Sequence, residues 1–228
     1  MSEIRFDAVH HRFGERTVLS GIDLTLTEPR IGIVGANGSG KSTLARMING
    51  LVEPTAGTVT VDGVDTAKQG REVRRRVGFV FTDPDNQIVM PTVAEDVAFS
   101  LRRSGLTKPE IAERVAQLLR RFGLDGHADH PTHLLSGGQK QLLALAAVLI
   151  REPSVLVADE PTTLLDLRNA RMVAELLAGL AEQVVLVTHH LELLADFDRV
   201  LVIEDGRVLA DDRPAPALAA YRQAVGRQ

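Results

Sequence analysis

Residues 35–42, with the sequence GANGSGKS, constrain the fold of this chain more than any other stretch. They match the pattern G-x-x-x-x-G-K-[S/T] of a phosphate-binding loop. The apolar run 31–34 before them predicts a buried strand, and residues 43–48 after them predict a helix. A glycine loop that leads into a helix presents inward-pointing N–H groups and the positive end of the helix dipole. The stretch therefore predicts a polyphosphate site, with a flexible glycine turn and an incidental lysine as the alternative.

The polar side chains of this loop extend the prediction. Lys41 would supply a positive charge to the β- and γ-phosphates of a nucleotide. The hydroxyl of Ser42 is a hard oxygen ligand of the kind that Mg²⁺ prefers. We expect nucleotide binding by the loop residues Gly35, Asn37, Gly38, Ser39, Gly40, Lys41, Ser42 and Thr43.

The composition excludes several other kinds of chemistry. A chain of 228 residues with 44% apolar and 25% charged residues is typical of a globular protein with ample core. The net charge of −4 provides no basic field for nucleic acid. There is no cysteine, so disulfides, thiol catalysis and cysteine-rich zinc sites are excluded. The start MSEIRF predicts no secretory signal, and no apolar run approaches the ~20 residues of a membrane span.

Hydrophobic patterning divides the chain into β-rich ends and a helical middle. Apolar or alternating runs predict strands at 4–10, 18–27, 31–34, 58–61, 77–81, 155–158, 184–187, 200–203 and 207–209. Apolar residues three or four apart predict helices from Thr92, from a capping box at residues 107–110, and over 169–180. The basic stretch 69–76 is predicted to be a solvated face.

We therefore predict an α/β fold of the P-loop NTPase (RecA-like) type. It has a mainly parallel sheet with helices on both faces, an antiparallel N-terminal β part and a helical subdomain. Residues 1–82 and 151–228 form the core and the β part, residues 83–150 form the helical subdomain, and the whole is one domain.

Two carboxylates end one of the predicted strands. Asp159 and Glu160 follow the apolar run 155–158 and precede Pro161. Ligands of doubly wound sheets bind at the carboxyl ends of strands, where the phosphate loop also lies. Asp159 can therefore hold Mg²⁺, and Glu160 can orient or polarise an attacking water. The neutral alternative is that both acids merely start a turn.

Two further stretches can contact a nucleotide. Ser136 is a good helix N-cap, and the glycines at 137 and 138 leave the first N–H groups of that helix uncovered. An ordinary capped helix explains this stretch equally well. His189 and His190 end another strand, and a histidine there can donate to a γ-phosphate, although a lone histidine is more often structural.

Taken in order, these stretches resemble the ATP-binding cassette of ABC transporters. The phosphate loop is followed by LSGGQ at 135–139, by DEP at 159–161 and by a strand ending in histidine. The resemblance covers nearly the whole chain. Its most specific part is LSGGQ upstream of the two acids, a pairing that P-loop kinases and small GTPases lack.

The resemblance implies a role for each motif residue. Lys41 and Ser42 match the Walker A lysine and the magnesium-binding hydroxyl, Asp159 ends the Walker B strand, and Glu160 is the catalytic carboxylate. His189 matches the switch histidine, which makes it the second catalytic residue. An ATP cofactor with Mg²⁺ is thereby implied.

The remaining motif residues match the parts of the cassette that contact ATP from other sides. Phe13 falls where an aromatic side chain stacks on adenine. Residues 163–166 match the D-loop. The signature, which in this family contacts ATP held by the opposing subunit, comprises Ser136, Gly137, Gly138 and Gln139.

This sequence departs from the family pattern in two places. Thr82 stands where the family usually has glutamine; its hydroxyl can ligate Mg²⁺ or hold a water, and Gln87 is a candidate substitute. Leu142 stands where a basic residue often follows the start of the signature helix. The first departure predicts slower hydrolysis or an altered link to a membrane partner.

Residues 83–89 and 92–99 are similar to the ATPase components of energy-coupling-factor transporters, which import vitamins and transition-metal ions. The short length and residues 187–198 resemble the biotin-type ATPase most. This implies a homo- or heterodimer of ATPase subunits at the cytoplasmic face of the cell membrane. Its partners would be an integral coupling subunit and a solute-binding membrane subunit.

Two rival hypotheses use the same ATP chemistry. A soluble ABC-type ATPase of DNA repair or translation usually carries two cassettes or a long coiled-coil insertion, and this sequence has neither. A regulatory nucleotide switch without useful turnover is favoured only by Thr82 and opposed by Asp159, Glu160 and His189.

Overall fold

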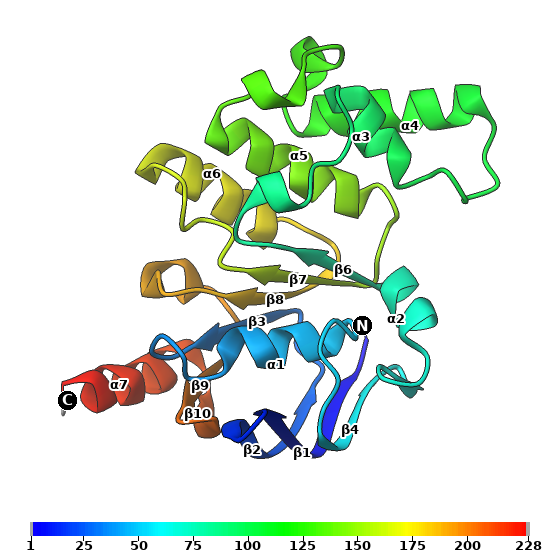
Figure 1. Ribbon diagram of the computed structural model, residues 1–228. Helices are drawn as coiled ribbons and strands as arrows, with labels where there is room; N and C mark the ends of the chain where they lie inside the picture. Colours follow the sequence, from blue (N-terminus) through cyan, green and yellow to red (C-terminus); the bar gives the residue numbers. More distant parts are fainter. Residues whose placement is uncertain (1, 227–228) are drawn as a thin grey trace. The chain divides into compact units, whose positions relative to one another are not determined.

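The computed structural model describes residues 2–226, and these form two compact units (Figure 1). The first unit contains residues up to 78, 154–160 and 180 onward. The second contains residues 79–153 and 161–179. Within the described residues, no helix has the length and apolar character needed to cross a membrane.

A mainly parallel sheet forms the centre of the first unit, as predicted. Its strands run in the order β10-β9-β3-β8-β7-β6. β9, β3, β8 and β7 pair in parallel, and β10 is antiparallel to β9. The bounds are β3 Arg30–Val34, β6 Val77–Val80, β7 Val155–Asp159, β8 Gln183–Val187, β9 Arg199–Glu204 and β10 Arg207–Asp212.

The register of this sheet explains why its strands read as continuous apolar runs. Ile31 lies beside Val185, and Val185 lies beside Val157. All three side chains are fully buried. Parallel strands covered on both faces bury every side chain, so their sequences lack polar alternation. Because β3, β7 and β8 run parallel, their carboxyl ends lie at one edge of the sheet. The phosphate loop follows β3, Glu160 follows β7, and the two histidines follow β8.

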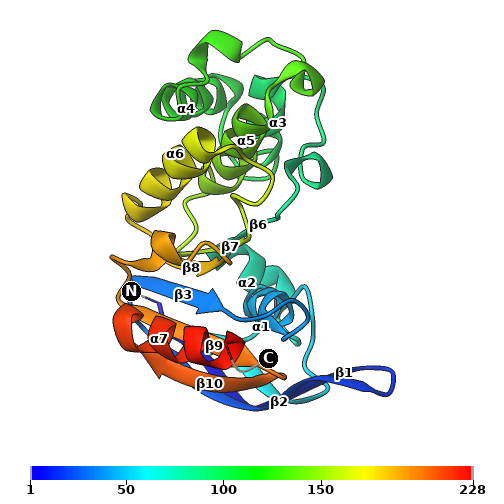
Figure 2. The ribbon, with the colours of Figure 1, turned by 90° about the vertical axis from the view of Figure 1, so that its left-hand side faces the viewer.

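The N-terminal strands form the predicted antiparallel sheet, in the order β2-β1-β4-β5. Their bounds are β1 Ile4–Phe13, β2 Arg16–Leu26, β4 Ala56–Val61 and β5 Val64–Asp65. The helix α1 (Lys41–Ile48) contacts strands of both sheets. α7 (Pro214–Val225) covers β9 and β10, as Figure 2 shows. The remaining elements of this unit are α2 (Gly70–Arg76) and the 3₁₀ turn η4 (Leu191–Leu194).

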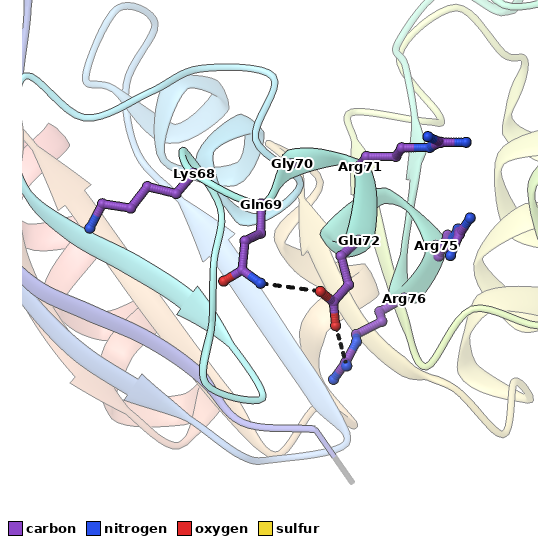
Figure 3. Close-up of a pocket in the computed structure, with 7 residues that line it drawn as sticks. All are labelled: Lys68, Gln69, Gly70, Arg71, Glu72, Arg75 and Arg76. Carbon is purple, nitrogen blue, oxygen red and sulfur yellow. Dashed lines mark hydrogen bonds and ion pairs between the residues drawn. The ribbon is translucent and has the colours of Figure 1, made fainter.

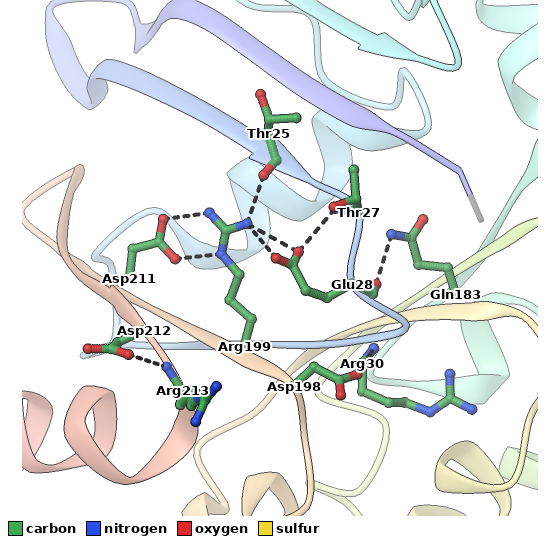
Figure 4. Close-up of polar contacts among 10 residues, drawn as sticks. All are labelled: Thr25, Thr27, Glu28, Arg30, Gln183, Asp198, Arg199, Asp211, Asp212 and Arg213. Atoms are coloured by element: carbon green, nitrogen blue, oxygen red, sulfur yellow. Dashed lines mark hydrogen bonds and ion pairs between the residues drawn. The ribbon is translucent and has the colours of Figure 1, made fainter.

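A polar cluster around Arg199 ties β9 and β10 to the end of β2 (Figure 4). Nε and Nη2 of Arg199 each donate to an Asp211 carboxylate oxygen at 2.6 Å, and Nη1 donates to the Thr25 carbonyl at 2.8 Å. Nη1 also lies 3.1 Å from both carboxylate oxygens of Glu28. Burial raises the pKa of Glu28, but hydrogen bonds from backbone N–H groups and Arg199 outweigh burial and lower it overall.

The second unit is helical. Its elements are η1 Pro84–Asn86, α3 Val93–Phe99, α4 Lys108–Arg121, η2 Asp125–His127, η3 Thr132–Leu134, α5 Gly137–Leu149 and α6 Leu167–Ala178. α5 contacts both α3 and α6, and most of its side chains are buried. The predicted capping box begins α4, where Thr107 N–H donates to the Glu110 carboxylate at 2.7 Å.

Several boundaries differ from the sequence-based expectation. The helical unit contains residues 79–153 rather than 83–150, and it also includes residues 161–179, because α6 packs on α5. The helix expected over 169–180 is Leu167–Ala178, since the side chain of Asp166 accepts a hydrogen bond from Asn169 N–H and so fixes its start.

Candidate nucleotide-binding site

Glycines at positions 35 and 40 allow the phosphate loop to approach other backbone closely. A Cβ on Gly35 would lie 2.1 Å from the Ile203 carbonyl oxygen. A Cβ on Gly40 would lie 2.8 Å from the Val18 carbonyl oxygen, and φ of Gly40 is +107°. Side chains at either position would push the loop away from β9 and β2. The loop conformation therefore depends on glycine, as the motif predicts.

Lys41 is held inside the loop that it serves. Only 5% of the residue is exposed, and Nζ donates to the Ala36 carbonyl at 2.9 Å. Burial lowers the pKa of Lys41, while the nearby carboxylates of Glu160 and Asp159 act in the opposite direction. A partly desolvated ammonium of this kind is well placed to gain from an incoming polyphosphate anion.

Ser42 and Asp159 come together as predicted, although 117 positions separate them in the chain. Ser42 Oγ donates to Asp159 Oδ1 at 2.8 Å. The other carboxylate oxygen of Asp159 lies 3.1 Å from Nη2 of Arg46. Asp159 is 1% exposed, so these contacts compensate for the burial of its charge.

The donor set of Ser42 and Asp159 fits Mg²⁺. A hydroxyl and a carboxylate are hard oxygen ligands, and their oxygens already lie 2.8 Å apart. Among the described residues, no group of three or more His, Cys, Asp and Glu side chains forms a separate metal site. Magnesium commonly takes one or two protein oxygens and completes its shell with phosphates and water, so two residues are sufficient.

Glu160 and His189 form a pair beside this centre. Nδ1 of His189 lies 2.8 Å from Oε2 of Glu160. Glu160 N–H donates to the Val187 carbonyl at 2.9 Å, which couples the ends of β7 and β8. Glu160 has φ of +52°, in the left-handed region that a non-glycine residue seldom adopts. His190, which follows His189 in the sequence, lies 3.3 Å from Glu192 and is not part of the pair.

Phe13 ends β1 with an exposed ring. The residue is 57% exposed, which is unusual for a phenylalanine in a folded chain. Its ring meets the ring of His11 edge to face, with centroids 4.5 Å apart. An exposed aromatic face of this kind is available for stacking on a base.

The predicted signature starts α5 in the second unit. Ser136 Oγ accepts from Gln139 N–H at 3.3 Å, and Ser136 N–H donates to the Gln139 side chain at 2.9 Å. This capping box leaves the N–H groups of Gly137 and Gly138 outside the cap contacts. A Cβ on Gly138 would lie 2.5 Å from the side chain of Asn169 on α6.

The two departures from the family pattern have different surroundings. Gln87 accepts from Phe81 N–H at 3.2 Å and donates to the Ala144 carbonyl at 3.1 Å. Its amide is therefore used inside the helical unit, and the idea that it substitutes at position 82 is not supported. Leu142 is buried in α5, where it packs as an apolar residue.

Sequence reasoning missed several contacts of site residues. Arg46 lies four positions after Ser42 on α1, and this helical spacing is the signal that could have found it beside Asp159. His127 Nε2 lies 3.0 Å from Nε2 of Gln139. Neither this contact nor that of Asn169 with Gly138 has a signal in local spacing.

A cavity of about 590 Å³ lies elsewhere in the first unit and is lined by Lys68, Gln69, Gly70, Arg71, Glu72, Arg75 and Arg76 (Figure 3). It contains none of the predicted site residues. Glu72 lies between Gln69 and Arg76 and is hydrogen bonded to both. Arg71, Arg74 and Arg75 are exposed, which agrees with the expected solvated face.

A phosphate loop leading into α1, a buried aspartate that ends β7, and a pair formed by the glutamate after β7 and a histidine after β8 define a P-loop ATPase. A model of the ABC transporter family matches residues 19–163. The chain belongs to this family, and it is an ATP-hydrolysing cassette.

Three known proteins illustrate the relationship. The biotin transport ATP-binding protein BioM of Rhizobium etli is 49% identical over 96% of this chain and 98% of its own. The structure of cbiO1 from Clostridium perfringens, part of the ABC transporter complex cbiONQ, has a TM-score of 0.83 at 31% identity, covering 98% of this chain and 93% of that one. The dimeric post-hydrolysis structure of the cassette MJ0796 with ADP and Pi has a TM-score of 0.81 at 30% identity, covering 92% and 98%.

Proposed function

We propose that this cassette powers the import of a small solute, such as biotin, another vitamin or a transition-metal ion, through a separate membrane subunit. The observation that carries the catalytic part is the meeting of Ser42, Asp159, Glu160 and His189 at the carboxyl ends of parallel strands. The importer part is supported by the similarity to a biotin transport protein and to a member of the cbiONQ complex.

In this proposal, the first unit binds and cleaves ATP. Phe13 stacks on the adenine, and the loop residues 35–43 with Lys41 hold the phosphates. Ser42 and Asp159 would hold Mg²⁺, and the bound ion would neutralise charge on the phosphate oxygens. Glu160 orients a water in line with the γ-phosphate, and His189 donates to that phosphate.

The second unit supplies the signature to a neighbouring cassette. Residues Ser136 to Gln139 would contact ATP held by the opposing subunit through the uncovered N–H groups at the start of α5. The dimer seen for the similar cassette MJ0796 supports this arrangement. We propose that the chain functions as one ATPase domain in such a dimer, peripheral to the cytoplasmic face of the membrane, with an integral coupling subunit and a solute-binding subunit.

Substitution of Glu160 tests the catalytic assignment. Glu160→Gln keeps the shape of the side chain and its hydrogen-bonding capacity but removes the charge that orients water. We expect ATP binding to persist while phosphate release falls by about 10²-fold or more. Glu192→Gln is the matched control, because this glutamate contacts His190 and is 71% exposed. Hydrolysis by the Glu160 variant at the parental rate would contradict the assignment.

Purification from membranes tests the importer assignment separately. A tagged chain extracted in mild detergent should co-purify with a small set of membrane-spanning subunits, one of which binds the solute. Recovery with ribosomes or nucleic acid would overturn the transport proposal and favour a soluble ATPase, while the ATP chemistry would stand.

A further inference from the structure

Arg16 begins β2 directly opposite Phe13, which ends β1. Directly paired residues of antiparallel strands project from the same face of a sheet. Arg16 therefore projects from the same face of the hairpin as the exposed ring of Phe13.

The start of β2 is fixed against the phosphate loop by backbone contacts. Ser20 N–H donates to the Gly206 carbonyl at 2.8 Å, and Gly206 N–H donates to the Ser39 carbonyl at 3.0 Å. The Val18 carbonyl lies so close to Gly40 that a Cβ there would be 2.8 Å away. Arg16 stands two residues before Val18, so its backbone is held beside the loop.

The guanidinium of Arg16 reaches the loop. Its Nη2 lies 3.5 Å from the position that a Cβ on Gly38 would occupy. Arg16 is exposed, and no ion pair or side-chain hydrogen bond links it to another of the residues 2–226. Nearby Arg12 differs, because its Nη2 donates to the Glu15 carbonyl at 3.0 Å.

We propose that Arg16 is a phosphate-binding residue of the nucleotide site, outside the loop motif itself. This inference rests on the proposed ATP site. A planar guanidinium offers a fork of N–H donors that matches phosphate oxygens, and it keeps its charge at any relevant pH. Held between the adenine platform and Gly38, it donates to the phosphates of ATP and of ADP alike. It lies outside the glutamate–histidine pair and takes no part in orienting water.

Nucleotide titration calorimetry on the full chain tests the assignment. Arg16→Ala should bind both ATP and ADP about tenfold more weakly than the parent, and Arg16→Lys should fall between them. KM for ATP should rise while kcat at saturating ATP stays near the parental value. Arg12→Ala is the matched control and should bind as the parent does. The parental affinity should also fall more steeply with added salt than that of Arg16→Ala.

Two outcomes would overturn the assignment. Parental affinity in Arg16→Ala would show that the guanidinium does not contact the nucleotide. An equal loss in Arg12→Ala would assign the effect to the general charge of the hairpin. Failure of the proposed ATP site is distinguishable, because the parental chain itself would then bind neither ATP nor ADP.

Discussion

At the scale of single residues, the site combines a strained backbone at Glu160 with buried charge. Glu160, with φ of +52°, holds a backbone conformation that costs about 1–3 kcal/mol at a non-glycine residue. Asp159 and Lys41 are almost fully buried beside it. Costs of this kind persist at functional sites where groups need a fixed arrangement, and Glu160 fits that pattern. Positive φ also occurs outside the motifs, at Ala8, Asp62, Glu152 and Asp205.

Lys41 gives the first prediction, which concerns pH. Its pKa is lowered by burial, so between that lowered value and the unfolded-state value of 10.5 the unfolded chain binds more protons than the folded one. The free energy of unfolding of the nucleotide-free chain should therefore rise with pH across this alkaline window. At pH values below the window, the full cost of burying the charged lysine is present. Lys41→Met should be at least as stable as the parent at neutral pH and should lose this part of the slope.

Thermal unfolding measured without nucleotide from pH 7 to 10.5 checks this expectation. Lys68→Met is the matched control, because the Lys68 side chain is 78% exposed. An unchanged slope in Lys41→Met would mean that burial of the ammonium carries no cost.

The residue scale also shows where sequence reasoning stops. The order of motifs and the rule that ligands gather at strand ends predicted the meeting of Ser42 with Asp159. The backbone contacts of Gln87 could not be predicted, because they depend on where residues 81 and 144 come to lie in the folded helical unit. Arg16 was missed because nothing in its local sequence distinguishes it from any exposed arginine.

At the scale of elements, strongly patterned segments were predicted and weakly patterned ones were missed. The parallel strands are marked by continuous apolar runs, and α4 is marked by apolar periodicity and a capping box. α7 was not predicted, because it is rich in alanine and buries only Ala217 and Leu218. α2 buries only Val73, so its sequence resembles a solvated face rather than a helix.

The Arg199 cluster gives a prediction for the β9–β10 hairpin. Arg199→Ala leaves the carboxylates of Asp211 and Glu28 without their cation, and we expect a loss of about 2–4 kcal/mol of stability. The lowered pKa of Glu28 contributes stability that is present above its unfolded value of 4.5 and lost as the pH falls through the folded value. The stability of the variant should therefore also fall less on acidification than the stability of the parent does.

Urea unfolding at pH 7 and pH 4 measures both effects. Arg207→Ala, an exposed arginine on β10, is the control. A variant as stable as the parent at both pH values would contradict a structural role for this cluster.

Packing of α5 on α6 gives a third prediction. Gly138→Ala would place a Cβ 2.5 Å from the Asn169 side chain, and overpacking of this kind costs about 1–3 kcal/mol. Asn169→Ala removes the obstructing atoms, so the double variant should regain much of the loss. A double-mutant cycle by chemical unfolding measures this coupling. Strict additivity of the two single variants would show that the glycine is required for another reason.

At the scale of the whole molecule, two of the motifs lie in separate compact units. The phosphate loop lies in the first unit and the signature in the second. If each signature serves the ATP of a second chain, two copies are sufficient to complete two equivalent sites. Because every required motif is present here, we expect this chain to pair with itself.

Sedimentation of the Glu160→Gln variant tests self-pairing, because ATP stays bound when turnover is lost. Without nucleotide the mass should be near 24.7 kDa, and with ATP it should be about twice that value.

Adding Gly137→Asp should abolish the ATP-dependent dimer, because a carboxylate at the signature would face the phosphates of the opposing ATP. The substitution should not disturb the fold: the nearest atom to a Cβ at Gly137 is 3.9 Å away, and an acidic residue suits the first turn of α5. Gly126→Asp adds the same charge where a Cβ meets no atom within 4 Å, and it should leave the dimer intact. A dimer that persists with Gly137→Asp would show that the signature does not lie in the interface. If Glu160→Gln alone stays a monomer with ATP bound, the second cassette is a different chain.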